Sequence, residues 1–138
     1  MTLEEQLTRD EGCQLTCYQD TLGNWTVGVG HKVPSNVGTI TQAMADAFLT
    51  SDIATAQRAV SSALSWASAL DPVRLDVLVN MAFNMGVGAL LQFHHFLGFM
   101  QTGDWSQASS AMLDSLWAKQ VHDRAQRLAA QVVSGVMQ

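Results

Sequence analysis

Residues 11–31 read EGCQLTCYQDTLGNWTVGVGH, and the rest of the chain is organised around this stretch. It places a glutamate, an aspartate, a threonine and a histidine among short segments that alternate with period two. In WTVGVGH, apolar residues alternate with Thr26, Gly28 and Gly30, so one face of the predicted strand carries almost no side chains. A ligand can approach the backbone closely there. A flat sugar ring fits this face better than a phosphate, because no phosphate-loop pattern follows.

The residues before this stretch predict a short helix. Thr2 and Glu5 have the spacing of a capping box, and Gly12 is a natural stop. We therefore expect Glu11 at the C-terminal end of the helix, where the negative pole of the helix dipole disfavours an ionised carboxylate. A solvated surface glutamate is the alternative at this point.

Helical patterns cover most of the remaining chain, at about residues 41–64, 72–85, 105–116 and 123–134, with a further helix that ends at about residue 100. Asp71 and Asp104 are expected to cap two of these helices at their N-terminal ends. Residues 72–85 are apolar on most sides, which predicts the buried central helix. The first long helix has several apolar residues available for one face: Met44, Phe48, Ala56, Val60 and Leu64. These patterns predict a mostly α (α+β) fold with one small antiparallel sheet.

Composition excludes several classes of function. The chain has 138 residues, 48% of them hydrophobic and 14% charged, which predicts one globular domain. Its formal charge of −5 argues against nucleic acid as a partner, and no apolar run is long enough for membrane insertion. No signal peptide is recognisable, so we expect synthesis in the cytoplasm. Cys13 and Cys17 lack metal-ligand company and are interpreted as reduced thiols, and we expect neither a cofactor nor a metal ion.

Glu11 and Asp20 are the first candidates for chemistry. Hydrolysis of a glycosidic bond needs an acid that protonates the leaving oxygen and a second group that stabilises positive charge or directs a water. Thr26, on the glycine-rich face, could hold that water. Ordinary surface carboxylates are the alternative. A serine hydrolase lacks a GxSxG motif here, and the neighbours of both cysteines include no activating histidine or cation.

The spacing of Glu11, Asp20 and Thr26, followed by GVGH ending at His31, resembles the active-site signature of phage-type lysozymes, the T4 lysozyme-like endolysins of glycoside hydrolase family 24. The resemblance includes the helix-end DEG, the YxDTxG turn and the WTVGVGH strand. It continues through NMAFNMG, GDWSQA, SLWAKQ and DRAQR in the order of the family.

This resemblance implies a two-lobed lysozyme-like fold over residues 1–138. A small β-hairpin lobe would cover about 12–45, a helical lobe 1–11 and 62–138, and a connecting helix 46–61. The implied function is that of a muramidase (endolysin), which hydrolyses the β-1,4 bond between N-acetylmuramic acid and N-acetylglucosamine in bacterial peptidoglycan. The family inverts the anomeric centre. Glu11 would be the general acid, while Asp20 and Thr26 would direct the attacking water.

Further residues are assigned by the same resemblance. It implies sugar contacts at Gly30, Lys32 and Phe83, with Asn84 beside the cleft. It also implies three supporting pairs, in which Arg124 would pair with Glu11, Arg127 with Asp10, and His31 with Asp52. The chain departs from the family at two other sugar-contact positions, which are Phe96 and Ala111.

The expected partner is the bacterial cell wall, on which the protein would act as a monomer. It would be made in the host cytoplasm and would need a separate holin for export. The acidic charge also departs from the basic enzymes of this type, which favours weaker attachment to an anionic wall. A peptidoglycan-binding module without catalytic activity on the same scaffold is the alternative function.

Overall fold

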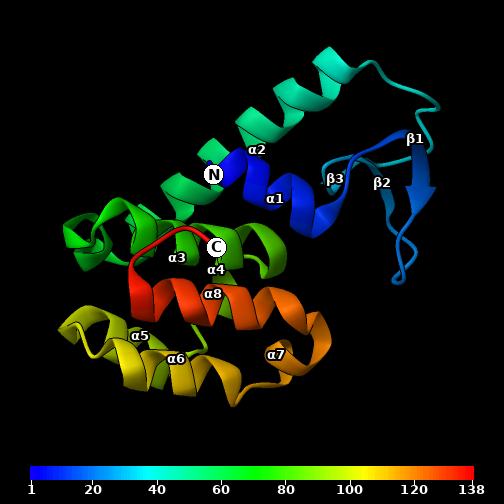
Figure 1. The fold of residues 1–138 in the computed structure, drawn as a ribbon. Coiled ribbons are helices and arrows are strands. Elements are labelled where there is room, and N and C mark those ends of the chain that lie inside the picture. Colours follow the sequence, from blue (N-terminus) through cyan, green and yellow to red (C-terminus); the bar gives the residue numbers. More distant parts are fainter. The chain divides into compact units, whose positions relative to one another are not determined.

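The computed structural model describes all 138 residues and contains two compact units. One comprises Thr2–Thr55, and the other comprises Met1 with Ala56–Gln138. Figure 1 shows α1 leading into a small sheet before α2, with the remaining helices following in sequence. The elements are α1 (Leu3–Glu11), β1 (Gln14–Gln19), β2 (Trp25–Gly28), β3 (His31–Lys32), α2 (Gln42–Ala63), the 3₁₀ helix η1 (Ser65–Ala69), α3 (Pro72–Met85), α4 (Val87–Leu90), α5 (His94–Thr102), α6 (Trp105–Leu113), α7 (Leu116–Val121) and α8 (Asp123–Ser134). The mostly α fold with one small antiparallel sheet is confirmed.

The predicted capping box fixes the start of α1. The Thr2 hydroxyl accepts a hydrogen bond from the Glu5 backbone N–H, and the Glu5 carboxylate accepts one from the Thr2 N–H. At the other end, Gly12 has a φ of 74° and its N–H bonds the Thr8 carbonyl. Because Gly12 tolerates this backbone conformation, the helix ends at Glu11, as predicted.

The three strands form an antiparallel sheet in the order β1-β2-β3. Tyr18 pairs with Thr26, and Thr26 pairs with Lys32, so these three side chains lie in one row on the same face. The opposite face is apolar and packs on the core of the N-terminal unit. That core is formed by Cys17, Val27, Ile40 and Ala45.

The long helix α2 confirms the predicted span, but the predicted buried face was wrong in its first turns. Met44 is 45% exposed, whereas the neighbouring Ala45 is fully buried. The prediction was out of phase by one residue there. Met44 and Ala45 are both apolar, as are Phe48 and Leu49, so periodicity alone does not decide which residue of each pair is buried. The buried residues of α2 are Ala45, Leu49, Ile53, Ala56 and Val60.

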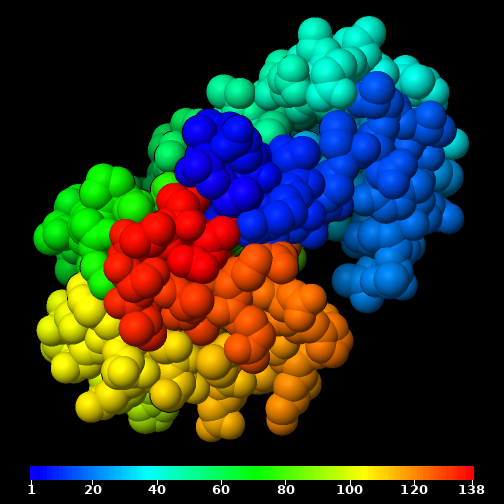
Figure 2. Space-filling model, viewed as in Figure 1, coloured from blue at the N-terminus to red at the C-terminus, as the bar shows by residue number.

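In the C-terminal unit, α3 is the predicted central helix. Asp71 caps it by accepting a hydrogen bond from the Arg74 N–H, and every residue from 77 to 82 is buried. Helix α8 packs against α3, α6 and α7. Figure 2 shows the surface of α8, orange to red, beside the yellow-orange surface of α6.

Two predictions for α6 were wrong. The helix ends at Leu113, and Leu116 opens the separate helix α7 with 71% of its surface exposed, because the Ser115 hydroxyl caps the new helix through the Ala118 N–H. Asp104 precedes α6 but makes no side-chain capping bond. Its carboxylate instead accepts a hydrogen bond from the Thr102 hydroxyl at 2.7 Å. None of the helices is both long and apolar enough to cross a membrane.

Candidate active site

The Glu11 carboxylate lies against the turn that joins β2 to β3. A Cβ atom added to Gly30 would be 3.3 Å from Glu11 Oε2 and 3.5 Å from its carboxyl carbon. Gly30 also has a φ of 64°, a conformation that other residues rarely adopt. Glycine at this position therefore serves two purposes, since it forms the turn and leaves room for the glutamate at the end of α1.

Asp20 follows β1 and organises the turn that leads into β2. Its backbone N–H donates to the Asn24 carbonyl at 2.9 Å, and its own carbonyl accepts the Gly23 N–H at 3.0 Å. The side-chain oxygen Oδ1 accepts the N–H groups of Leu22 at 2.9 Å and Asn24 at 2.8 Å. The second oxygen, Oδ2, accepts Lys32 Nζ at 2.8 Å and Asn24 Nδ2 at 3.2 Å.

These contacts hold the pKa of Asp20 well below the usual range of aspartate. The Lys32 ammonium is the largest cause, followed by the backbone N–H of Asn24. Partial desolvation opposes them, while the Asn24 side chain and the Leu22 N–H add smaller stabilisation of the charged form. Asp20 is therefore ionised throughout the neutral and mildly acidic range.

Thr26 is 2% exposed and stands between Tyr18 and Lys32 in the row across the sheet. Its hydroxyl donates to the Asn24 carbonyl at 3.0 Å. Because the single hydroxyl proton is used in this bond, the oxygen offers its lone pairs as acceptors. Asn24 thus contacts both Asp20 and Thr26, through three hydrogen bonds to the first and one to the second.

Tyr18 connects the two candidate carboxylates electrostatically. Burial raises the pKa of its phenol, the negative charge of Glu11 raises it further, the Lys32 ammonium lowers it, and Asp20 raises it. The ionisation of Tyr18 is therefore sensitive to the charges of both Glu11 and Asp20. Tyr18 and Asn24 were not predicted as site residues, because the strand pairing that brings Tyr18 beside Thr26 is not apparent from the sequence.

His31 and Asp52 form the expected pair, with His31 Nδ1 2.7 Å from Asp52 Oδ2. The imidazole also stacks on Phe48, with ring centroids 4.1 Å apart and planes inclined by 6°. Phe48 and Asp52 are four residues apart on α2, so they lie on one face of that helix. This contact fastens β3, which carries Lys32, to the first half of α2.

The other predicted site residues lie as follows. In the N-terminal unit, Asp10 accepts a hydrogen bond from Arg9 Nε at 3.3 Å. In the C-terminal unit, the buried Arg124 donates from Nε to Asn80 Oδ1 at 3.0 Å. The pairings of Arg124 with Glu11 and of Arg127 with Asp10 would connect residues of different units and remain predictions.

Of the predicted substrate contacts in the C-terminal unit, Asn84 accepts a hydrogen bond from Trp117 Nε1 at 2.8 Å, and Phe83 is half-buried. Phe96 is 1% exposed and belongs to the core, so its side chain is not available for a surface contact with sugar. No group of three or more His, Cys, Asp and Glu side chains comes together in an arrangement that could hold a metal ion.

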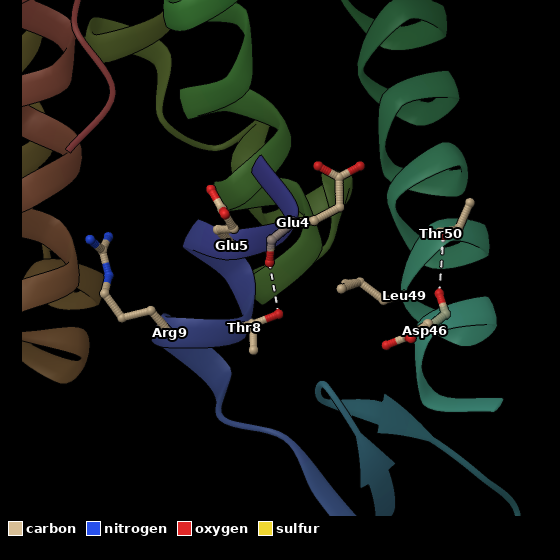
Figure 3. A pocket seen from close by; sticks show the side chains of 7 residues that line it. All are labelled: Glu4, Glu5, Thr8, Arg9, Asp46, Leu49 and Thr50. Atoms are coloured by element: carbon tan, nitrogen blue, oxygen red, sulfur yellow. Dashed lines mark hydrogen bonds between the residues drawn. The ribbon is translucent and has the colours of Figure 1, made fainter. Parts of the chain in front are cut away.

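A pocket between α1 and α2 lies apart from the candidate residues. Figure 3 shows Leu49 pointing from α2 toward α1, while Arg9 extends from the other side of α1. Thr8 and Thr50 return their hydroxyls to the carbonyls of Glu4 and Asp46 in their own helices. None of the predicted catalytic residues lines this pocket.

Comparison with known proteins identifies the class. The sequence model of the family described as phage lysozyme matches residues 8–135. The chain is 34% identical to the pre-baseplate central spike protein Gp5 of Enterobacteria phage T4, and the match covers 98% of this chain but 28% of that protein. It is 25% identical to the probable T4-type lysozyme 1 of Dictyostelium discoideum, over 99% of this chain and 96% of that protein. It is 33% identical to an endolysin of Acyrthosiphon pisum secondary endosymbiont phage 1, over 82% of this chain and 75% of that protein.

These findings, together with the mostly helical fold, define a lysozyme, a glycoside hydrolase that acts on peptidoglycan. The chain belongs to the phage lysozyme family.

Proposed function

We propose that this lysozyme hydrolyses the β-1,4 bond between N-acetylmuramic acid and N-acetylglucosamine with inversion at the sugar carbon, and that Glu11, Asp20 and Thr26 carry the reaction. The observation that supports this most directly is the placement of both carboxylates along one short segment: Glu11 lies against Gly30, and Asp20 bonds Lys32, two residues further on. Glu11 and Asp20 therefore act on the same small region beside the sheet, as a pair of glycosidase carboxylates must.

In the proposed reaction, Glu11 donates its proton to the glycosidic oxygen as the bond from that oxygen to the sugar carbon breaks. A water molecule attacks the same carbon from the opposite side of the ring, which inverts its configuration. This geometry requires room for the water, so we predict a separation of roughly 6.5–9.5 Å between the two carboxyl groups in the complex with glycan.

Asp20 and Thr26 would orient the water. The ionised Asp20 stabilises the positive charge that develops on the sugar, accepts a hydrogen bond from the water and takes the proton that the water loses as it attacks. The Thr26 oxygen accepts the other, because its own proton is donated to Asn24. A water that donates both hydrogens in this way presents a lone pair to the sugar carbon.

The remaining residues would serve binding and support. We propose that Gly30, Lys32, Phe83 and Asn84 contact the sugars. We also propose that Asp10, Arg124 and Arg127 support the acid, and that the His31–Asp52 pair holds the strand carrying Lys32. The enzyme would act as a monomer on the cell wall, after synthesis in the host cytoplasm and release by a separate holin.

The test replaces Glu11 by Gln and follows the release of reducing ends from purified peptidoglycan. Glu4→Gln is the matched control, because it makes the same change in the first turn of the same helix. We expect Glu11→Gln to fold normally and to lose at least about a hundredfold in rate, which is typical for a general acid. The control should keep full activity.

Retained hydrolysis by the Glu11→Gln variant would remove Glu11 from the role of acid. The stereochemistry is tested separately by NMR of the product formed in the first minutes, before the anomers equilibrate. An initial α-anomer supports inversion, and an initial β-anomer contradicts it.

A further inference from the structure

The Asp20 carboxylate has no unused position for a water molecule. A carboxylate offers about four lone-pair positions on its two oxygens. Four donors occupy them, which are the N–H groups of Leu22 and Asn24 on Oδ1, and Lys32 Nζ with Asn24 Nδ2 on Oδ2. If Asp20 is to direct a water, as the proposed function requires, one of these donors has to leave first.

The two backbone donors belong to the turn itself and stay in place. The turn is closed by two further backbone bonds, from the Asp20 N–H to the Asn24 carbonyl and from the Gly23 N–H to the Asp20 carbonyl. Moving the N–H of Leu22 or Asn24 away from Oδ1 would require this turn to change its backbone conformation. The releasable donors are therefore the two side chains that bond Oδ2, Lys32 and Asn24.

Of these two, Lys32 is the better suited to leave. Its side chain is 62% exposed, and a four-carbon stem lets the ammonium move without any shift of the backbone. Exposed ion pairs gain little net free energy, because water solvates both charges well. The Asn24 amide, by contrast, is attached to the residue whose backbone N–H and carbonyl already bond Asp20.

The position of Lys32 gives the released ammonium a new partner. Lys32 pairs with Thr26 across the strands, so its side chain leaves from the same face of the sheet that carries Thr26. An ammonium has three donors and no acceptor, and sugar hydroxyl or acetamido oxygens are suitable acceptors. A glycan on this face can therefore receive the hydrogen bond that Asp20 loses.

We propose that Lys32 is a positioning residue released by the substrate: its ammonium occupies Asp20 Oδ2 in the free enzyme and moves to an oxygen of the bound glycan, which opens Oδ2 to the attacking water. This inference rests on the proposed function of Asp20. It gives the same carboxylate two states, fully hydrogen-bonded without glycan and open to water with glycan.

The two states differ in the proton affinity of Asp20. In the free enzyme, Lys32 is the largest cause that lowers the pKa of Asp20. Its departure must raise that pKa and make Asp20 a stronger base when the substrate is bound. The titratable groups near Asp20 are Lys32 on β3 and Tyr18 on β1, and Glu11 at the end of α1 acts on the same Tyr18.

The experiment titrates the Asp20 carboxyl carbon by NMR, using protein labelled at its aspartates. The protein carries Glu11→Gln so that a soluble peptidoglycan tetrasaccharide stays intact, and it is measured with and without this glycan. The second variant adds Lys32→Met. The control adds Lys119→Met, which removes the same charge from the only other lysine, an exposed residue of α7.

We expect the glycan to raise the pKa of Asp20 in the parent and in the Lys119→Met control. Without glycan, Lys32→Met should already raise it, and the glycan should then add a clearly smaller shift. Desolvation by the glycan also raises an aspartate pKa. An equal shift with and without Lys32 would therefore assign the effect to desolvation and overturn the proposal, as would a glycan that leaves the pKa of Asp20 unchanged in the parent.

Asn24→Ala separates the two side-chain donors. If Asn24 were the donor that leaves, this substitution and not Lys32→Met would reduce the glycan-induced shift, which would refute the role of Lys32. The titration follows binding rather than turnover. New reducing ends in the Glu11→Gln samples would thus refute the role of Glu11 separately, without deciding the release of Lys32.

Discussion

Arg74 joins the start of α3 to the end of α8, and its replacement should destabilise the C-terminal unit. Its Nε donates to the Val132 carbonyl at 2.7 Å and its Nη2 to the Val133 carbonyl at 3.2 Å. Both carbonyls belong to the last turn of α8, where helix carbonyls lack partners within the helix. The guanidinium also lies 4.1 Å from the ring centroid of Trp105 and bonds Asp71 at 3.2 Å.

The loss expected for Arg74→Met follows from these contacts. The short, part-buried bond from the charged Nε to the Val132 carbonyl should contribute about 1.5–3 kcal/mol, and the longer, exposed bond to Val133 much less. The contact with the Trp105 ring adds roughly 0.5–1 kcal/mol. The bond to Asp71, whose side chain is 40% exposed, adds little. Because methionine keeps much of the packing of the arginine stem, we expect a loss of about 2–4 kcal/mol in the free energy of unfolding.

Urea unfolding followed by tryptophan fluorescence measures this loss. Arg74→Lys keeps the charge but not the planar fork, so it should lose an intermediate amount. Lys119→Met removes a positive charge from an exposed position and should stay within about 0.5 kcal/mol of the parent. If Arg74→Met also changes the free energy of unfolding by less than about 0.5 kcal/mol, Arg74 does not support the end of α8.

Two further predictions concern the site. Gly30→Ala should reduce hydrolysis strongly, because the new Cβ would meet the Glu11 carboxylate at 3.3 Å, and the φ of 64° should cost about 1–2 kcal/mol in backbone strain. The matched Gly23→Ala, at a φ of 83° with open space around it, should show the strain without the loss of hydrolysis. The Lys32–Asp20 pair should stabilise the fold in a pH-dependent way. The folded pKa of Asp20 is lowered, so the difference in the free energy of unfolding between the parent and Lys32→Met should be constant above about pH 5, where aspartate is ionised in the unfolded chain too. This gap should narrow as the pH falls below about 4, because the unfolded chain then takes up a proton at Asp20 first. Urea unfolding at a series of pH values measures this gap, and a gap that widens in acid would contradict the sign.

The parts of the site that could be predicted from the sequence are those fixed by nearby residues. The capping box and Gly12 set both ends of α1, which places Glu11 at the end of the helix. The alternation in WTVGVGH likewise places Thr26 on the side of the strand away from Val27, which is buried in the core. Each of these features depends on residues only a few positions apart.

The parts that could not be predicted depend on pairing between strands. The row of Tyr18, Thr26 and Lys32 exists because the β1–β2 register shifts between Gln14 and Tyr18. Alternation alone fixes neither this register nor the partner strand. The contact of Lys32 with Asp20, the largest influence on that carboxylate, was therefore not apparent from the spacing of the motif.

The environment of Asp20 combines both kinds of contact. An aspartate that accepts the N–H two residues later forms a common turn, so the bonds from Leu22 and Asn24 to Oδ1 are a local property of the sequence. The bond from Lys32 to Oδ2 needs β3 to be paired with β2, and the stacking of His31 on Phe48 helps to hold β3. The turn thus fixes the position of the carboxylate, whereas strand pairing largely sets its proton affinity. Because the two come from different residues, replacing Lys32 should alter the ionisation of Asp20 without moving it.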